Sequence, residues 1–202
     1  MLAKTSPLCL ISYAIAAVAF VTVVLSCAPS PISSPSGMKT ITFHPSMSAP
    51  WNPLNDGVMG GLSEGQTTFT DSTMRWTGET RLENNGGFAS VRSPWSHTNL
   101  QTMTGVVIRC KGKGGPFKLT LETSERWWMP YAYAAFTPSE DWQDVEILVE
   151  EFSWSQAQMG DLKGVSPARE LSDVLRLGLM KYDGTAQSFE LEVASMRFIE
   201  EG

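Results

Sequence analysis

The chain has 202 residues, which is enough for one domain or at most two small ones. Hydrophobic residues make up 42% of it, and 17 Gly with 12 Pro are too few for a disordered or fibrous chain. Its 15 Lys and Arg residues against 21 Asp and Glu residues give a formal net charge of −6. A chain of this sign lacks the basic field that attracts phosphate backbones, so we do not expect nucleic-acid binding. Three cysteines cannot form a disulfide framework.

The N-terminal residues have the pattern of a secretory signal. Lys4 precedes an uncharged, apolar run over residues 8–25, and residues 24–27 (Val-Leu-Ser-Cys) resemble a bacterial lipobox. In proteins with that box, a peptidase cuts before the Cys, whose thiol carries diacylglycerol. We therefore expect a signal peptide over residues 1–26 and a lipid on Cys27, which makes the protein a membrane-anchored lipoprotein of the bacterial cell envelope. An uncleaved spanning helix is the alternative, because the apolar run is close to the minimum length for one.

Residues 27–37 are rich in Pro and Ser. Such a tract cannot bury apolar area and stays extended, so it suits a tether between the lipid and the domain. Cys110 would then be the one unmodified cysteine of the mature chain. It ends the strand-like run 105–110, and we expect a buried free thiol there, because no neighbouring pattern marks it as a nucleophile.

Short β-rich runs separated by turn residues fill the rest of the chain, and no long stretch has a helical period. Residues 117, 119 and 121 are apolar and alternate with polar residues, as in a strand with one buried face. This pattern predicts a single all-β domain over residues 38–202, built as an antiparallel sandwich or barrel. The predicted strands are residues 40–43, 66–70, 74–80, 87–92, 105–110, 117–123, 131–136, 142–149, 174–180, 189–193 and 196–199.

Long irregular connections are expected over residues 52–63 and 153–171, and long connections in compact domains are often functional. Within the first, residues 55–63 (Asn-Asp-Gly-Val-Met-Gly-Gly-Leu-Ser) are rich in glycine but lack the Gly-Lys-Ser/Thr of a phosphate-binding loop. We favour a structural turn in which Asp56 bonds local amides. A loop that contacts a ligand or partner is the alternative.

A second motif, residues 86–92 (Gly-Gly-Phe-Ala-Ser-Val-Arg), leads into a strand. If the strand is regular, Phe88, Ser90 and Arg92 share one face. Arg92 then either pairs with a carboxylate or recognises an anion. We favour an internal salt bridge with Asp56, because each motif contributes one charge of opposite sign.

Aromatic residues concentrate in the stretch 127–133, which includes Trp127 and Trp128. Exposed aromatic rings serve for stacking on sugars and for protein interfaces. We nevertheless expect at least half of these residues to pack in the core. His44 and His97 have no metal-ligand spacing, and no nucleophile elbow is present.

Both motifs belong to a wider resemblance. Together with Trp51 and with residues 105–109, 131–136, 142–147, 177–179 and 189–193, they resemble the complex I intermediate-associated protein family, whose best-known members are mitochondrial assembly factors for NADH:ubiquinone oxidoreductase. The resemblance implies a jelly-roll β-sandwich similar to galactose-binding domains and a non-enzymatic role. The chain departs from the family at residues 113–116, which lack the Asp of a Gly-Asp-Gly turn. Its export signal is also at odds with a mitochondrial partner.

From these observations we expect a non-enzymatic binding or assembly-factor-like module that is tethered to a membrane and binds an unidentified protein or glycan. A carbohydrate-binding module is the alternative, and a hydrolase comes third. We expect no catalytic residue, cofactor or metal. The candidate binding residues are Asn55, Asp56, Met59, Gly60, Gly61, Ser63, Arg92, Trp127 and Trp128.

Overall fold

The computed structural model describes residues 39–45, 50–126, 128–155, 167 and 170–201. The predicted signal peptide, Cys27 and the tether therefore lie outside the described residues, and so does Trp127. Within the described ranges, no helix has both the length and the apolar character needed to cross a membrane.

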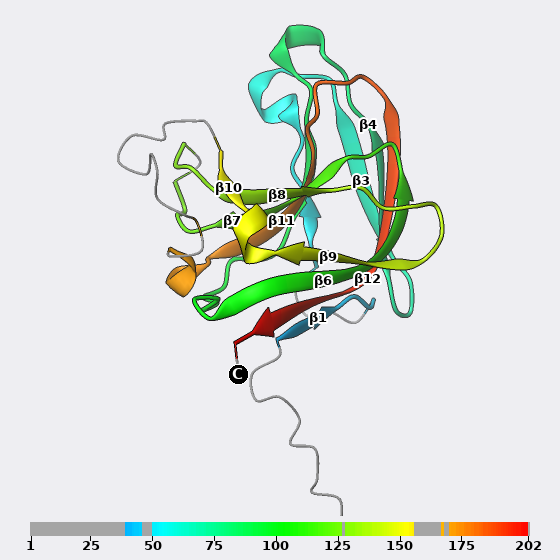
Figure 1. Cartoon of the computed structure of the whole chain (residues 1–202). Coiled ribbons are helices and arrows are strands. Elements are labelled where there is room, and N and C mark those ends of the chain that lie inside the picture. Colours follow the sequence, from blue (N-terminus) through cyan, green and yellow to red (C-terminus); the bar gives the residue numbers. More distant parts are fainter. Residues whose placement is uncertain (1–38, 46–49, 127, 156–166, 168–169, 202) are drawn as a thin grey trace, which may run out of the picture. The chain divides into compact units, whose positions relative to one another are not determined.

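One antiparallel sheet, here called sheet A, has the strand order β3-β4-β12-β6-β9, and β1 pairs with β12 beside this path (Figure 1). Its strands are β1 (Thr40–Thr42), β3 (Glu64–Phe69), β4 (Met74–Glu79), β6 (Met103–Lys113), β9 (Gln143–Leu148) and β12 (Ser188–Glu200).

The second antiparallel sheet, sheet B, has the order β10-β8-β7-β11-β5-β2. Its strands are β2 (Asn52–Pro53), β5 (Ala89–Arg92), β7 (Phe117–Glu122), β8 (Ala132–Phe136), β10 (Ser153–Trp154) and β11 (Arg176–Lys181). The described helical segments are short 3-10 turns: η1 (Asp56–Met59), η2 (Glu83–Asn85), η3 (Val149–Glu151) and η6 (Leu171–Asp173).

Aromatic side chains from both sheets meet in the core. The ring of Trp76 on β4 lies 5.9 Å from that of Phe117 on β7 and 4.6 Å from that of Phe189 on β12. Phe117, Leu119 and Leu121 are fully buried, as their alternation predicts. Burial of one large apolar side chain contributes about 1.5–3 kcal/mol, so this inter-sheet cluster holds the sandwich together. The predicted antiparallel β-sandwich is confirmed.

Strand β12 differs from the expectation, which divided it into two strands. Its first half pairs with β4 and its second half with β1, and it pairs with β6 along its length (Figure 1). A register shift between Val193 and Ser195 marks a β-bulge. The bulge absorbs one extra residue without ending the strand.

The aromatic stretch also differs from the expectation. Trp128 is exposed, and Tyr131 and Tyr133 are half-buried outside the core cluster. The core side of β8 is taken instead by Ala132, Ala134 and Phe136. Since successive strand residues point to opposite faces, the tyrosines lie on the solvent side of sheet B.

Candidate binding cleft

A buried carboxylate joins the two glycine motifs. One oxygen of Asp56 accepts a hydrogen bond from the backbone N–H of Ser63 at 2.8 Å. The other accepts from the Ser63 hydroxyl at 2.6 Å and from the backbone N–H groups of Gly87 at 2.7 Å and Phe88 at 3.2 Å. Burial alone raises the pKa of Asp56, but these hydrogen bonds outweigh it and hold the pKa below its ordinary value. The predicted bonding of Asp56 to a local amide is confirmed at Ser63, whereas the amides of Gly87 and Phe88 come from the distant second motif.

The glycines give this carboxylate its space. Gly60 has φ +88°, which favours glycine. A Cβ on Gly61 would lie 2.3 Å from the Asp56 carboxyl carbon, and one on Gly86 would lie 2.6 Å from a carboxylate oxygen. Real Cβ atoms do not approach other atoms this closely, so both positions exclude a side chain while Asp56 stays in place.

The same loop exposes two apolar side chains. Val58 is 70% exposed and Met59 is 61% exposed, although they follow the fully buried Asp56 by only two and three residues. The Asn55 side chain donates from Nδ2 to the carbonyl of Gly65 at 3.2 Å, which ties the start of the loop to β3. The hydrogen bonds of Asn55 and Asp56 therefore fix the loop to the domain, while its tip faces solvent.

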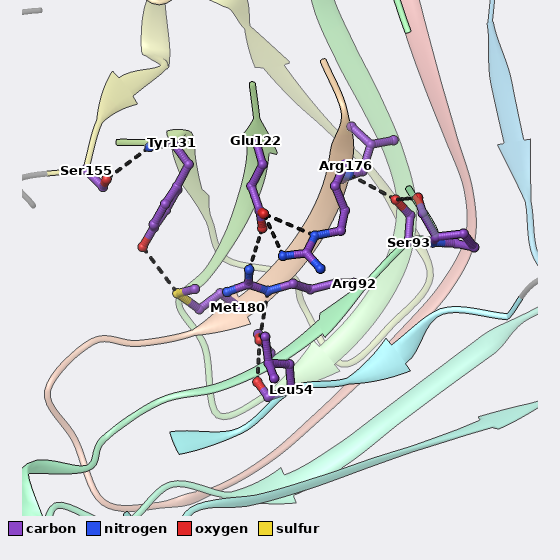
Figure 2. A network of polar contacts seen from close by, with 11 residues as sticks. Leu54, Arg92, Ser93, Glu122, Tyr131, Ser155, Arg176 and Met180 are labelled. Atoms are coloured by element: carbon purple, nitrogen blue, oxygen red, sulfur yellow. Dashed lines mark hydrogen bonds and ion pairs between the residues drawn. The ribbon is translucent and has the colours of Figure 1, made fainter. Parts of the chain in front are cut away.

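The predicted salt bridge between Asp56 and Arg92 is wrong. Arg92 instead donates from Nη1 to Glu122 of β7 at 2.6 Å. Arg176 of β11 donates from Nε and Nη2 to the other oxygen of the same carboxylate, at 3.0 and 2.7 Å. Figure 2 shows Glu122 between the two guanidinium groups. Asp56 does not need Arg92, because backbone amides and a hydroxyl already satisfy its oxygens.

A glycine on the intervening strand lets Arg92 reach Glu122. Gly178 of β11 pairs with Arg92 on one side and with Thr120 on the other. A Cβ at this position would lie 2.5 Å from Oγ1 of Thr120 and 3.5 Å from Cγ of Arg92. The missing side chain thus opens a path across β11, along which the arginine of β5 contacts the glutamate of β7.

Arg92 and Arg176 line a cleft of about 570 Å³ on the solvent side of sheet B. Its lining combines aliphatic, aromatic and cationic side chains, and the exposed loop tip forms part of its rim. The residues that line it are Leu54, Val58, Met59, Phe88, Arg92, Tyr131, Arg176, Met180 and Tyr182.

Cations on this face lie against aromatic rings. The guanidinium of Arg176 is 3.8 Å from the ring centroid of Trp95. The ammonium of Lys118 is 4.7 Å from the ring of Tyr133 and 5.0 Å from that of Tyr182. Burial lowers the pKa of Arg92; Glu122 opposes this effect and the charge of Arg176 adds to it. A guanidinium nonetheless stays protonated at neutral pH.

The candidate residues fall into separate groups. Met59 and Arg92 line the cleft, whereas Asn55, Gly60, Gly61 and Ser63 build the loop behind it. Trp128 lies exposed in the connection between β7 and β8 and does not line the cleft. Sequence reasoning missed Leu54, Val58, Phe88, Glu122, Tyr131, Arg176, Met180 and Tyr182 as site residues.

The solvent side of sheet A has a different character. It carries ion pairs between neighbouring strands, such as Arg75 with Glu190 at 2.9 Å and Lys111 with Glu192 at 3.2 Å. Arg109 pairs with Asp144 at 3.4 Å, and both side chains are about half exposed. Such a charged, solvated face contrasts with the apolar and cationic cleft on sheet B.

Comparison with known proteins confirms the resemblance. Residues 41–193 match the model of a family described as complex I intermediate-associated protein 30. No curated protein matches the sequence.

Among solved structures, the fold is similar to the family 11 carbohydrate-binding module of the cellulosomal cellulase Lic26A-Cel5E of Clostridium thermocellum. That structure is 13% identical, with a TM-score of 0.62 over 83% of this chain and 97% of the module. The same family's module from Clostridium thermocellum, in complex with a β-1,3-1,4-mixed-linked tetrasaccharide, is 13% identical, with a TM-score of 0.59 over 83% and 98%.

Proposed function

The chain belongs to the complex I intermediate-associated protein 30 family, and from that premise we propose that it is a non-enzymatic binding module whose partner is a segment of another protein. The segment docks in the sheet B cleft. The observation that carries this proposal is the rim of the cleft, where Val58 and Met59 are exposed on a loop fixed by the buried Asp56.

Exposed apolar side chains gathered beside a cleft are typical of interaction sites. Fixing the loop before binding matters as well, because a preorganised surface loses less conformational entropy when the partner docks. Asp56 supplies this order through four hydrogen bonds to Ser63, Gly87 and Phe88. The glycine motifs therefore support binding indirectly, by presenting the two side chains.

The composition of the cleft favours a polypeptide. The cores of protein interfaces are enriched in aromatic residues, Met and Arg and depleted in Lys and acidic residues. Among the described residues, the lining includes two Met, two Arg, two Tyr and one Phe but no acidic residue or Lys, since Glu122 contacts the two arginines without lining the cleft itself.

A photo-crosslinking experiment tests this proposal. Val58 is replaced by p-benzoylphenylalanine in the full chain, expressed in its host and irradiated. The matched control carries the same group at Glu146, an exposed position on the solvent side of sheet A. We expect a defined protein adduct at position 58 that disappears when Met59→Asp is added. Equal adducts at both positions, or none at position 58, would contradict the proposal.

A glycan is the second candidate. Lys118, Tyr133 and Tyr182 form a cation–aromatic row on the same face, and rings with adjacent hydrogen-bond donors suit a sugar chain. The similar module with the mixed-linked tetrasaccharide motivates the choice of probe. Calorimetric titration with that tetrasaccharide, using the wild type and Tyr182→Ala, distinguishes the candidates. Saturable heat that is lost in the variant would favour the glycan.

We also propose that the module is a lipoprotein tethered through Cys27. The support is the lipobox-like sequence of residues 24–27 and the Pro/Ser tract after it. Several acyl chains anchor a protein stably, whereas one chain binds weakly. A tethered module would search for its partner along a membrane surface.

A further inference from the structure

We propose that the segment taken up by the cleft presents an acidic side chain, flanked by apolar residues, to Arg92 and Arg176. This inference rests on the proposed binding of a protein segment in the same cleft. It names the chemistry that the partner must carry.

The first observation is an imbalance of charge. Arg92 and Arg176 share the single carboxylate of Glu122, and the three side chains are only 16%, 17% and 10% exposed. Two positive charges against one leave an excess of one positive charge in a sparsely solvated place. Lys118 adds a further cation on this face. The chain as a whole carries a net charge of −6, so the positive charge at the cleft is opposite in sign to the charge of the whole chain.

The second observation is the set of donors still available. Among the described residues, Arg92 donates from Nε to Ser90 and from Nη1 to Glu122. Arg176 donates from Nε and Nη2 to Glu122. A guanidinium carries five N–H donors in a fixed plane, so each arginine retains a terminal nitrogen for a ligand. Carboxylates match this geometry, and charge-assisted hydrogen bonds are stronger than neutral ones.

The third observation is the surroundings of the two arginines. Glu122 and the stacking of Arg176 on the ring of Trp95 hold the guanidiniums in place before any ligand arrives. Leu54, Met180 and Tyr131 line the same cleft. An incoming carboxylate would therefore meet fixed cations between apolar walls, where water screens charges less than on an open surface. Apolar groups next to the acid would pack on those walls.

Two matched peptides test the inference. The purified, 15N-labelled full chain is titrated at low salt with N-acetyl-Leu-Glu-Leu-amide and with N-acetyl-Leu-Gln-Leu-amide, which differ in charge but hardly in shape. We expect the Glu peptide to bind in the millimolar range, at least about tenfold more tightly than the Gln peptide. The Nε–H signals of Arg92 and Arg176 and the amide of Met59 should shift.

Variants locate the effect. Arg92→Met should reduce the affinity for the Glu peptide to that for the Gln peptide. Glu122 keeps Arg176 as its partner in this variant, and Arg176→Met serves as a second variant should the first not fold. The control is Arg109→Met on the solvent side of sheet A, where an exposed arginine also pairs with a carboxylate. It should leave both affinities unchanged.

Several results would overturn the inference. They are equal affinity for the two peptides, shifts confined to sheet A, or no saturable binding of either peptide at millimolar concentration. The crosslink at position 58 separates this failure from that of the proposed function. An adduct there with equal peptide affinities would leave partner docking in place and remove the acidic recognition alone.

Discussion

At the scale of single residues, one buried carboxylate explains why the two glycine motifs occur in the same chain. Asp56 lies in the first motif and bonds backbone amides of the second, which begins thirty residues later at Gly86. Gly61 and Gly86 are glycines because their Cβ atoms would occupy the space of that carboxyl group. Neither motif can therefore change independently of the other.

We expect Asp56→Asn to destabilise the domain by about 1–3 kcal/mol, because an amide cannot accept all of the buried donors that the carboxylate accepts. Urea unfolding measures the change. In double-mutant cycles, Ser63→Ala should show coupling with Asp56→Asn, because the two side chains bond directly. Arg92→Met serves as the control and should be additive with Asp56→Asn. Coupling between Asp56 and Arg92 would contradict the pairing of Arg92 with Glu122 instead of with Asp56.

The lowered pKa of Asp56 predicts a dependence of stability on pH. A carboxyl whose pKa is lower in the folded state stabilises the fold above its unfolded pKa of about 3.9. That contribution is lost as the pH falls from this value through the folded pKa. We therefore expect the free energy of unfolding to differ between wild type and Asp56→Asn near neutral pH, and the difference to narrow in acid. A difference that is constant with pH would refute this prediction.

Gly178 offers a test of how the arginine pair is built. Gly178→Ala places a methyl group against Oγ1 of Thr120 and next to the stem of Arg92, so we expect Arg92 to lose its contact with Glu122. The Nε–H signal of Arg92 should move, and affinity for acidic peptides should fall. Gly57→Ala is the matched control, because no described atom outside its own turn lies within 4 Å of its added Cβ. An unmoved Arg92 signal in Gly178→Ala would reject this account.

Sequence alone could identify Asp56 as an acceptor for a local amide, because the Ser63 N–H donor lies in the same glycine-rich loop. It could not identify the partner of Arg92. Glu122 lies on a strand that is separated from β5 by β11, a strand that comes much later in the chain. Only the order of strands in the sheet brings these residues together. The alternation of residues 117–122 does predict that Lys118, Thr120 and Glu122 share the face opposite the core, but it does not identify the arginines that meet Glu122 there.

At the scale of elements, the strands were predictable because the period of two is plain in most of them. Strand β12 shows the limit of that signal. Buried residues occupy odd positions up to Val193 and even positions from Met196 onward. In sequence, such a change of parity resembles the end of one strand and the start of another. In the structure, a bulge makes the same change within a continuous strand.

Cys110 lies on strand β6, and its side chain is buried. Burial together with the charge of Asp144 raises the pKa of the Cys110 thiol to about 12. The pKa of a cysteine thiol in an unfolded chain is about 8.5. We expect iodoacetamide at mildly alkaline pH to modify Cys110 slowly in the native protein and rapidly in urea, as measured by peptide mass mapping. Equal rates in both states would contradict a buried, protonated thiol.

At the scale of the whole domain, the two sheets differ in what they offer to solvent. Sheet A carries exposed ion pairs, which contribute little stability and keep the surface hydrated. Sheet B carries the cleft, whose rim is apolar and whose two arginines share the carboxylate of Glu122. The sandwich fold was predictable from the spacing of short strands, but which of its two faces carries the cleft was not. That distinction depends on side chains from β5, β7, β8 and β11 that meet only in the folded sheet.

The proposed tether leads to a prediction for the whole molecule. If Cys27 carries the lipid, Cys27→Ala should move the protein from the membrane fraction to the soluble fraction or leave an unprocessed precursor, because the anchor depends on that thiol. Fractionation and intact mass measure the outcome, and Cys9→Ala is the matched control, since residue 9 lies within the predicted signal peptide. The control should be processed and anchored like the wild type. Unchanged mass and fractionation in Cys27→Ala would reject lipidation and favour an uncleaved helix as the anchor. In either case we expect the cleft of sheet B to bind its probes with the same affinity, because the lining that the structure describes comes from residues between Leu54 and Tyr182.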